Sequence, residues 1–85
     1  MTSATSLLEF PTDLPIKVLG RNEAAFRELA IAIVREHYPE HTVAEQQSRQ
    51  GVYLSLTITV HAASREQVDA VYRALVAEPQ ILMVL

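Results

Sequence analysis

The 85-residue chain contains no cysteine, which excludes disulfide bonds, thiolate metal sites and a thiol nucleophile. It also contains no apolar stretch that approaches the ~20 residues needed to span a bilayer. Residues 1–12 lack both the basic region and the long apolar region of a signal peptide. These absences favour a cytoplasmic protein that does not associate with a membrane.

Basic residues are scarce relative to acidic ones. Seven Lys and Arg residues stand against ten Asp and Glu residues, for a formal net charge of −3. The seven are spread along the sequence, whereas a protein that binds a nucleic-acid backbone normally carries a basic patch. We therefore expect no nucleic-acid partner.

The apolar content is sufficient for one folded domain. Hydrophobic residues make up 49% of the chain, which is unlike a disordered composition, and the length is too small for two domains. We divide the chain into an N-terminal lead-in at residues 1–12 and a single domain at residues 13–85. Residues 1–6 are small and polar, and we expect them to be disordered.

Two segments have the periodicity of amphipathic helices. Residues 23–37 are expected to start after Asn22 as N-cap, with Glu23 in the first turn. A second helix should begin at Ser64, where Gln67 completes a capping box. Their apolar stripes consist of Phe26, Leu29, Ala30, Ile33, Val34 and His37 in the first helix, and Val68, Val71, Tyr72 and Leu75 in the second.

Four segments are predicted to be strands, of which residues 52–61 are the clearest. There Val52, Leu54, Leu56, Ile58 and Val60 alternate with Tyr53, Ser55, Thr57, Thr59 and His61. Strict alternation indicates one buried and one solvated face, which is typical of an antiparallel sheet. Residues 14–20 and 80–85 are apolar strands, and residues 42–49 are polar enough for an edge strand.

The order of these segments is β-α-β-β-α-β. Each helix has a single apolar stripe, so both must cover the same apolar face of the sheet. Right-handed crossovers then predict an α+β fold, a two-layer ferredoxin-like sandwich with a four-stranded antiparallel sheet. The first and third strands would be central and the second and fourth would form the edges.

The ordered set of segments also resembles a known family. The segments are "LLEFPT", "KVLG", "GVYLS" with the following "TIT", "EQVDAVYRAL" and the terminal "VL". Together they resemble the YbeD-like family of small bacterial proteins of unknown function, from Leu7 to Leu85. The resemblance implies a free-standing domain with a fold similar to the ACT domains that bind amino acids in metabolic enzymes, and it brings no catalytic residue set.

The outward-facing side chains of residues 52–61 form the first candidate surface. They could bind a ligand or a partner, and they could equally be the solvated side of an ordinary strand, where Thr is favoured. Lys17 should point the same way from the neighbouring strand. The candidate surface is therefore Lys17, Tyr53, Ser55, Thr57, Thr59 and His61.

The last strand forms the second candidate surface because it is apolar on both faces of the pleat. Ile81, Met83 and Leu85 are expected to alternate with Leu82 and Val84, so both faces need cover. Exposed apolar area on an edge strand marks an interaction site or a liability. We assign the edge-strand contact to Leu82, Met83 and Val84.

The lead-in and a second chain are both candidates to cover the last strand. A tail without a role need not carry three large apolar side chains. We expect these residues to fold back onto the domain: Leu7, Leu8 and Phe10.

Two other function classes stay open. A small acyl- or phosphoryl-handling enzyme of acylphosphatase-like fold could use Lys17, Arg21 and His61. However, the loop "GRNE" lacks a glycine-rich phosphate cradle and the third strand lacks an asparagine. RNA binding on the sheet face would need two or three aromatic side chains, and that strand carries only Tyr53.

No metal or cofactor site is predicted. The chain has three histidines, His37, His41 and His61. His37 and His41 are separated by Pro39 and lie beyond a regular helical pair, and His61 is distant in sequence. We expect structural or surface roles for all three.

The function expected from these observations is a non-enzymatic regulatory or adaptor domain. It would act by binding a small metabolite or by contacting a protein, through the open sheet face or the terminal edge strand. A homodimer is one form that the contact could take.

Overall fold

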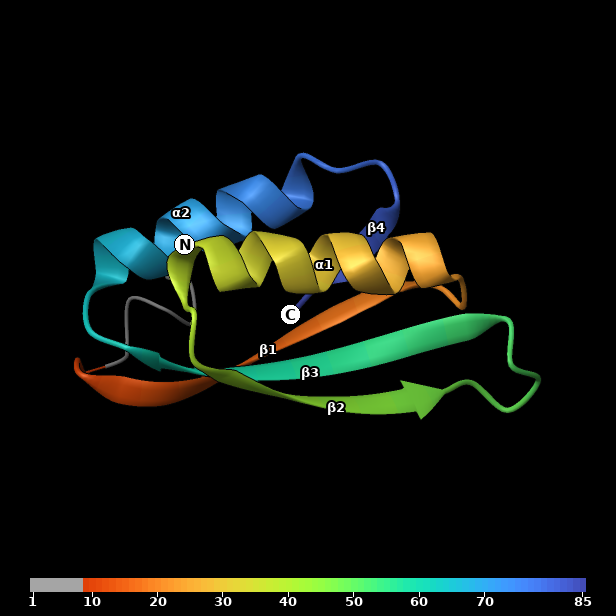
Figure 1. Cartoon of the computed structure of the whole chain (residues 1–85), viewed down its shortest axis with the longest axis horizontal. Coiled ribbons are helices and arrows are strands. Elements are labelled where there is room, and N and C mark those ends of the chain that lie inside the picture. Colours follow the sequence, from red (N-terminus) through yellow and green to blue (C-terminus); the bar gives the residue numbers. More distant parts are fainter. Residues whose placement is uncertain (1–8) are drawn as a thin grey trace.

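A computed structural model describes residues 9–85 of the chain (Figure 1). The elements are, in order, β1 (Thr12–Arg21), α1 (Ala24–His37), β2 (His41–Gln47), β3 (Tyr53–Ala62), α2 (Arg65–Val76) and β4 (Ile81–Val84). The strands form one sheet in the order β2-β3-β1-β4, with every neighbouring pair antiparallel. Both helices lie on the same side of this sheet (Figure 1). The predicted ferredoxin-like α+β fold, with β1 and β3 in the centre, is therefore confirmed.

The core lies between the helices and the sheet, and alternation along β1 and β3 creates it. Every second residue of each strand points towards the helices and is buried. The predicted helical stripes face it, with Leu29, Ile33, His37 and Tyr72 at half-buried positions on their margins. The buried members are Leu14, Ile16, Val18, Leu54, Leu56, Ile58, Val60, Ala62 and Ile81 from the strands, Phe26, Ala30, Val34, Val68, Val71 and Leu75 from the helices, and Tyr38 after α1.

Two predicted helix caps differ from those observed. The N-cap of α1 is Glu23 rather than Asn22, and it makes no side-chain cap bond. Asn22 instead donates its Nδ2 to the carbonyl of Gly51 at 3.0 Å, tying the start of α1 to the β2–β3 turn. At α2, Ser64 Oγ accepts from the Gln67 amide at 3.3 Å as predicted. The side-chain amide of Gln67 is directed to α1 instead, where its Nε2 donates to the carbonyl of His37 at 2.9 Å.

The β2–β3 turn moves the adjoining boundaries of both strands relative to the prediction. The Gly51 amide donates to the Ser48 carbonyl at 2.9 Å, and Gly51 has a φ of 74°, in the left-handed region that favours glycine. Ser48 and Arg49 therefore leave β2, and β3 starts at Tyr53. Val52 was expected to be buried, but it belongs to the turn and is 45% exposed.

Pro15 is tolerated within β1 because the pairing with β4 does not extend to it. Lys17 exchanges two main-chain hydrogen bonds with Leu85, of 3.2 and 2.8 Å, so the odd-numbered residues of β1 direct their main-chain groups towards β4. Among the described residues, the β4 ladder stops at this row. Pro15 lies one step beyond it, where its missing N–H costs no ladder hydrogen bond.

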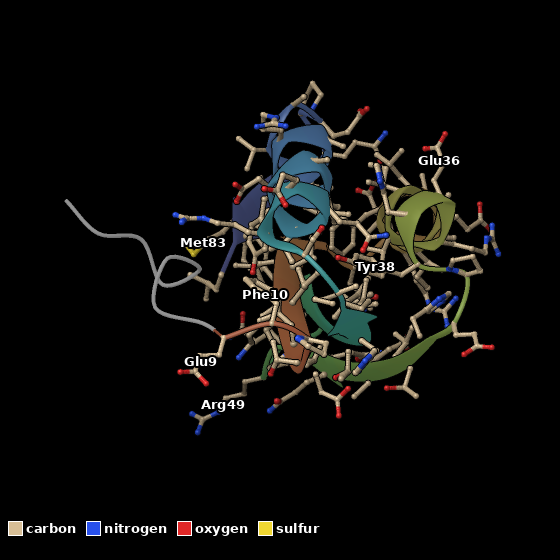
Figure 2. All side chains as sticks on the ribbon, turned by 90° about the vertical axis from the view of Figure 1, so that its left-hand side faces the viewer. Glu9, Phe10, Glu36, Tyr38, Arg49 and Met83 are labelled. Atoms are coloured by element: carbon tan, nitrogen blue, oxygen red, sulfur yellow. The ribbon has the colours of Figure 1, made fainter. Side chains whose placement is uncertain are left out.

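The part of the lead-in that the structure describes supports the predicted folding back. Phe10 is half-buried and packs against the core, and Figure 2 shows it turned towards the interior while Glu9 points away. Leu7, Leu8 and the six preceding residues lie outside the described part of the chain. Within residues 9–85, none of the helices is both long enough and apolar enough to cross a membrane.

Gly20 leaves the space that Phe26 occupies. A Cβ atom at Gly20 would overlap the ring of Phe26, which is 1% exposed and fixed in the core. We expect Gly20→Ala to lower the free energy of unfolding by about 1–3 kcal/mol, as overpacking does, measured by urea denaturation. In a Phe26→Leu background the cost of Gly20→Ala should fall by at least about 0.5 kcal/mol. An equal cost in both backgrounds would assign the effect to the backbone rather than to the ring.

Tyr38 offers a second test of the core. Its side chain is 5% exposed and its hydroxyl has no hydrogen-bond partner within the described chain. A buried hydroxyl left unpaired costs about 1–3 kcal/mol, so Tyr38→Phe should raise the free energy of unfolding. Tyr72→Phe is the matched control, because the Tyr72 hydroxyl donates to the Leu85 main-chain oxygen at 3.2 Å. A loss of stability in both variants would show that Tyr38 has a partner after all.

The same two tyrosines predict an alkaline dependence of stability. Burial raises the pKa of Tyr38 and of Tyr72 above the ordinary value of 10.0. Because the folded pKa is the higher one, their contribution is fully present below pH ~10 and is lost as the pH rises through the folded pKa. Urea unfolding between pH 9 and pH 11 should show this decline, and Tyr38→Phe should reduce it.

Candidate functional site

The face of the sheet opposite the helices carries the predicted candidate surface. The β1–β3 register pairs Lys17 with Thr57, and the neighbouring rows of this face follow the same parity. The structure thus places all six predicted residues on the open face: Lys17, Tyr53, Ser55, Thr57, Thr59 and His61. They do not gather at one point, because successive members of the β3 set are two residues apart along an extended strand.

One end of the open face is closed by a polar pair. His61 Nδ1 lies 2.9 Å from Asp13 Oδ1, and the two side chains are 70% and 79% exposed. Exposed pairs of this kind contribute little to stability. Each side chain supplies the other with a hydrogen-bond partner.

The other end of the open face is hollowed. A depression of about 360 Å³ lies over the ends of β1, β2 and β3 next to the β2–β3 turn. Lys17 is the one residue of the lining with a charged side chain, and Leu19 and Leu85, the last residue of the sequence, supply aliphatic surface. The complete lining is Lys17, Leu19, Gln46, Gln47, Ser48, Tyr53, Ser55 and Leu85.

Three basic residues converge around Tyr53 at this end. Lys17 shares the depression with Tyr53, and the Arg21 guanidinium lies over the Tyr53 ring, 5.9 Å from its centroid. Arg49 and Tyr53 line an adjoining hollow on the turn, and neither hollow has an acidic residue in its lining. The sequence showed the basic residues as evenly spread. Strand pairing changes this, because it brings Arg21 and Arg49 to the same end of the sheet beside Tyr53, while Lys17 lines the depression from the middle of β1.

β4 adds apolar side chains to the open face in a pattern that differs from the prediction. The register between β1 and β4 shifts between Leu19 and Gly20, so that Gly20 pairs with Ile81 while Leu19 pairs with Met83. Ile81 is therefore buried and Val84 packs against the core from the same side.

The simple alternation expected for the last strand is consequently wrong. Of the three predicted contact residues, Leu82 is 54% exposed, Met83 is 50% exposed and Val84 is half-buried. Met83 and Leu85 lie on the open face, and Leu85 is 65% exposed. Figure 2 shows Met83 and Arg49 projecting on the side of the sheet away from the helices. The open face thus combines exposed apolar groups with the three basic residues.

The residues considered for catalysis are not brought together. Arg21 pairs with Tyr53, Lys17 with Thr57, and His61 with Asp13. Neighbouring pairs in this set are four residues apart along the strand, which corresponds to about 13 Å at the rise of an antiparallel strand. A single small substrate could not contact Lys17, Arg21 and His61 in this arrangement.

The other two histidines have local positions. His41 Nδ1 lies 3.0 Å from the carbonyl of Tyr38, and the His37 carbonyl accepts from Gln67. Residues 9–85 contain no group of three or more His, Asp or Glu side chains that could hold a metal ion.

Several residues that line the depression were not among those predicted from the sequence. Gln46, Gln47 and Ser48 reach it through the β2–β3 register, and Leu85 reaches it through the register shift in β4. Only Leu19 carried a usable signal, because it has the same parity as Lys17 on β1.

Comparison with known proteins identifies relatives that align with nearly the whole chain. A family model described as "Protein of unknown function (DUF493)" matches residues 5–85. A UPF0250 protein of Nitrosomonas europaea is 41% identical over 83 residues, which cover 94% of this chain and 95% of the relative. UPF0250 proteins of Ralstonia nicotianae and of a Janthinobacterium species are 45% and 46% identical over 83 residues each, covering 94% of this chain and 86% and 91% of those relatives.

Proposed function

The chain belongs to the DUF493 family of bacterial proteins of unknown function. We propose that it is a non-enzymatic regulatory or adaptor domain. It contacts a protein partner through the open face of its sheet. The observation that carries this proposal is the concentration of exposed apolar and basic side chains at one end of that face.

The apolar part of this surface is unlike an ordinary solvated strand. Met83, Leu85 and Tyr53 are 50%, 65% and 39% exposed. Scattered exposed apolar residues are normal, but neighbouring ones framed by polar groups are typical of interaction sites. Tyrosine and methionine are also among the residues enriched at protein interfaces.

The basic side chains of this surface indicate the charge of the partner. Arg21, Lys17 and Arg49 border Tyr53, while the chain as a whole has a net charge of −3. A partner with an acidic and partly apolar surface would complement this end of the sheet. Complementary charge would speed its association and orient it.

The wide spacing of the candidate catalytic groups favours recognition over chemistry. General acid–base and nucleophilic mechanisms need two or more groups within hydrogen-bond reach of the same reacting atoms. On this face Lys17 stands apart from both Arg21 and His61.

A matched pair of substitutions tests the assignment of the surface. The chain should be immobilised and used to capture proteins from a bacterial lysate, with and without Met83→Glu. This substitution should reduce capture of a specific partner at least tenfold. It places a charge within an apolar contact, and its negative sign repels an acidic partner. Val76→Glu is the control, since Val76 is 68% exposed on α2 in the opposite layer.

The outcome identifies the face that makes the contact. Loss of the partner with Val76→Glu and retention with Met83→Glu would move the contact to the helices and refute the proposal. Light scattering of the purified chain shows whether the partner is a second copy. Twice the monomer mass, reversed to the monomer by Met83→Glu alone, would make the contact a homodimer.

A further inference from the structure

We propose that the free edge of β2 binds an extended, uncharged segment of a partner protein, which adds to the sheet as an antiparallel strand. This surface is separate from the end of the open face proposed above. The argument rests on the main-chain groups along the outer edge of β2 and on the side chains beside them.

The edge of β2 that faces away from β3 presents main-chain groups without partners. β2 is the outermost strand on one side of the sheet (Figure 1). The Ser48 amide donates to the Tyr53 carbonyl at 2.9 Å in the same register as the β2–β3 ladder, so the even-numbered residues of β2 face β3. The odd-numbered residues face outwards, and within residues 9–85 no main-chain hydrogen bond reaches them: His41, Val43, Glu45 and Gln47.

The other free edges of the sheet are less suited to pairing. β4 has four residues and a shifted register, and the Tyr72 hydroxyl donates to the Leu85 main-chain oxygen beside it. The part of β1 beyond the β4 ladder contains Pro15, which has no N–H. β2 contains neither proline nor lysine, and its seven residues pair with β3 without a register shift. Proteins usually protect an edge strand with such features, and an edge without them is suited to strand addition.

The charges along β2 favour an uncharged segment. Glu45 is bonded to the Arg27 guanidinium of α1. A charged residue opposite Glu45 would compete with one member of this ion pair. His41 directs its Nδ1 to the Tyr38 carbonyl at 3.0 Å, and the other side chains of β2 are neutral.

The side chains beside the edge predict an alternating segment. Val43 and Ile31 are half-buried and pack against the core. Ile31 is one turn from Arg27 on α1, and Val43 is two residues from Glu45 on β2, so the ion pair brings both to the same flank. An apolar side chain opposite Val43 would cover them. On the open side β2 carries small or polar residues, which favour polar neighbours: Thr42, Ala44 and Gln46.

A second copy of β2 fits this edge less well than a foreign segment. Antiparallel pairing of two whole β2 strands about a two-fold axis would place Val43 opposite Glu45 of the second copy. A shift of two residues in one direction would place the two Glu45 carboxylates opposite each other, which is destabilising. A shift in the other direction would place Gln47 opposite Pro39, outside the strand.

The probe is the heptapeptide acetyl-Gln-Thr-Thr-Thr-Ile-Thr-Ser-amide, whose isoleucine is opposite Val43 when the peptide pairs antiparallel with the whole of β2. The 85-residue chain, labelled with ¹⁵N, is titrated with it at pH 7. Saturable amide shifts should be centred on residues 41–47 and 27–31. No saturable shift, or shifts centred on β4, would overturn the proposal.

Two methylated peptides test the main-chain hydrogen bonds without changing the protein. N-methylation of the isoleucine removes the N–H that faces β2, and it should weaken binding at least tenfold. N-methylation of the following threonine is the matched control, because that N–H faces away from β2. It should weaken binding less than threefold, and an equal loss with both peptides would refute strand addition.

Two substitutions at Val43 make the same comparison on the protein. Val43→Pro removes the outward N–H and leaves the hydrogen bonds to β3 in place, so it should weaken the heptapeptide at least tenfold. Val43→Ala loses part of the apolar contact but keeps the N–H, and it should weaken binding less than fivefold. A comparable loss in both variants would assign binding to the side chain and contradict the proposal.

Light scattering separates a partner segment from a second copy. The unmutated chain should have the same mass as Val43→Pro. Twice the monomer mass, reversed to the monomer by Val43→Pro, would assign the edge to a second copy and overturn the proposal. Because the test of the open face depends on Met83 and this one depends on Val43, either proposal can fail without the other.

Discussion

Every residue of β1 has a partner on β3, from Thr12 with Ala62 to Arg21 with Tyr53, and this antiparallel ladder runs through the middle of the sheet. It holds the two alternating patterns in register, so that all the buried side chains of both strands face the same way. If β1 slipped by one residue against β3, Ile16 would turn to solvent and Lys17 into the core while Ile58 stayed buried. Both helices cover the apolar side, and the polar side is left open as a consequence of the same register.

The second constraint acts where β1 ends. Gly20 allows the Phe26 ring to pack directly over the strand, and the register between β1 and β4 changes at this same glycine. Because of that change, Ile81 and Val84 can both contribute to the core. Met83 and Leu85 are then directed to the open face, next to Leu19 and Lys17. The close packing of Phe26 on the helix side and the register change that places Met83 and Leu85 on the open face thus meet at one residue, Gly20.

The sequence predicts the elements of this fold well because their patterns are local. The alternation in residues 52–61 and the stripes from Phe26 to Val34 and from Val68 to Leu75 follow from periodicity alone, and one layer of helices over one sheet follows from them. The failures occur where a residue depends on a distant partner. Asn22 bonds to Gly51 and Gln67 bonds to His37 rather than capping their own helices. The parity of β4 could not be read from five consecutive apolar residues, because only the pairing with β1 decides it.

The same difference explains why the sequence predicted only part of the candidate surface. Lys17 and the outward residues of β3 could be placed on one face from alternation. The convergence of Arg21, Arg49 and Lys17 on Tyr53 needed the β1–β3 register and the geometry of the turn, and it contradicts the even spacing of these residues in the sequence.

Once these positions are known, the chemistry of the face follows from what surrounds each charge. At one end His61 and Asp13 are bonded to each other, whereas at the other Arg21 and Arg49 lie beside Tyr53. A shallow surface of this kind cannot exclude water from a reacting centre, but it can discriminate by charge and shape. The proposed protein contact rests on exposed apolar side chains that lie on the same face as the basic residues and away from the His61–Asp13 pair.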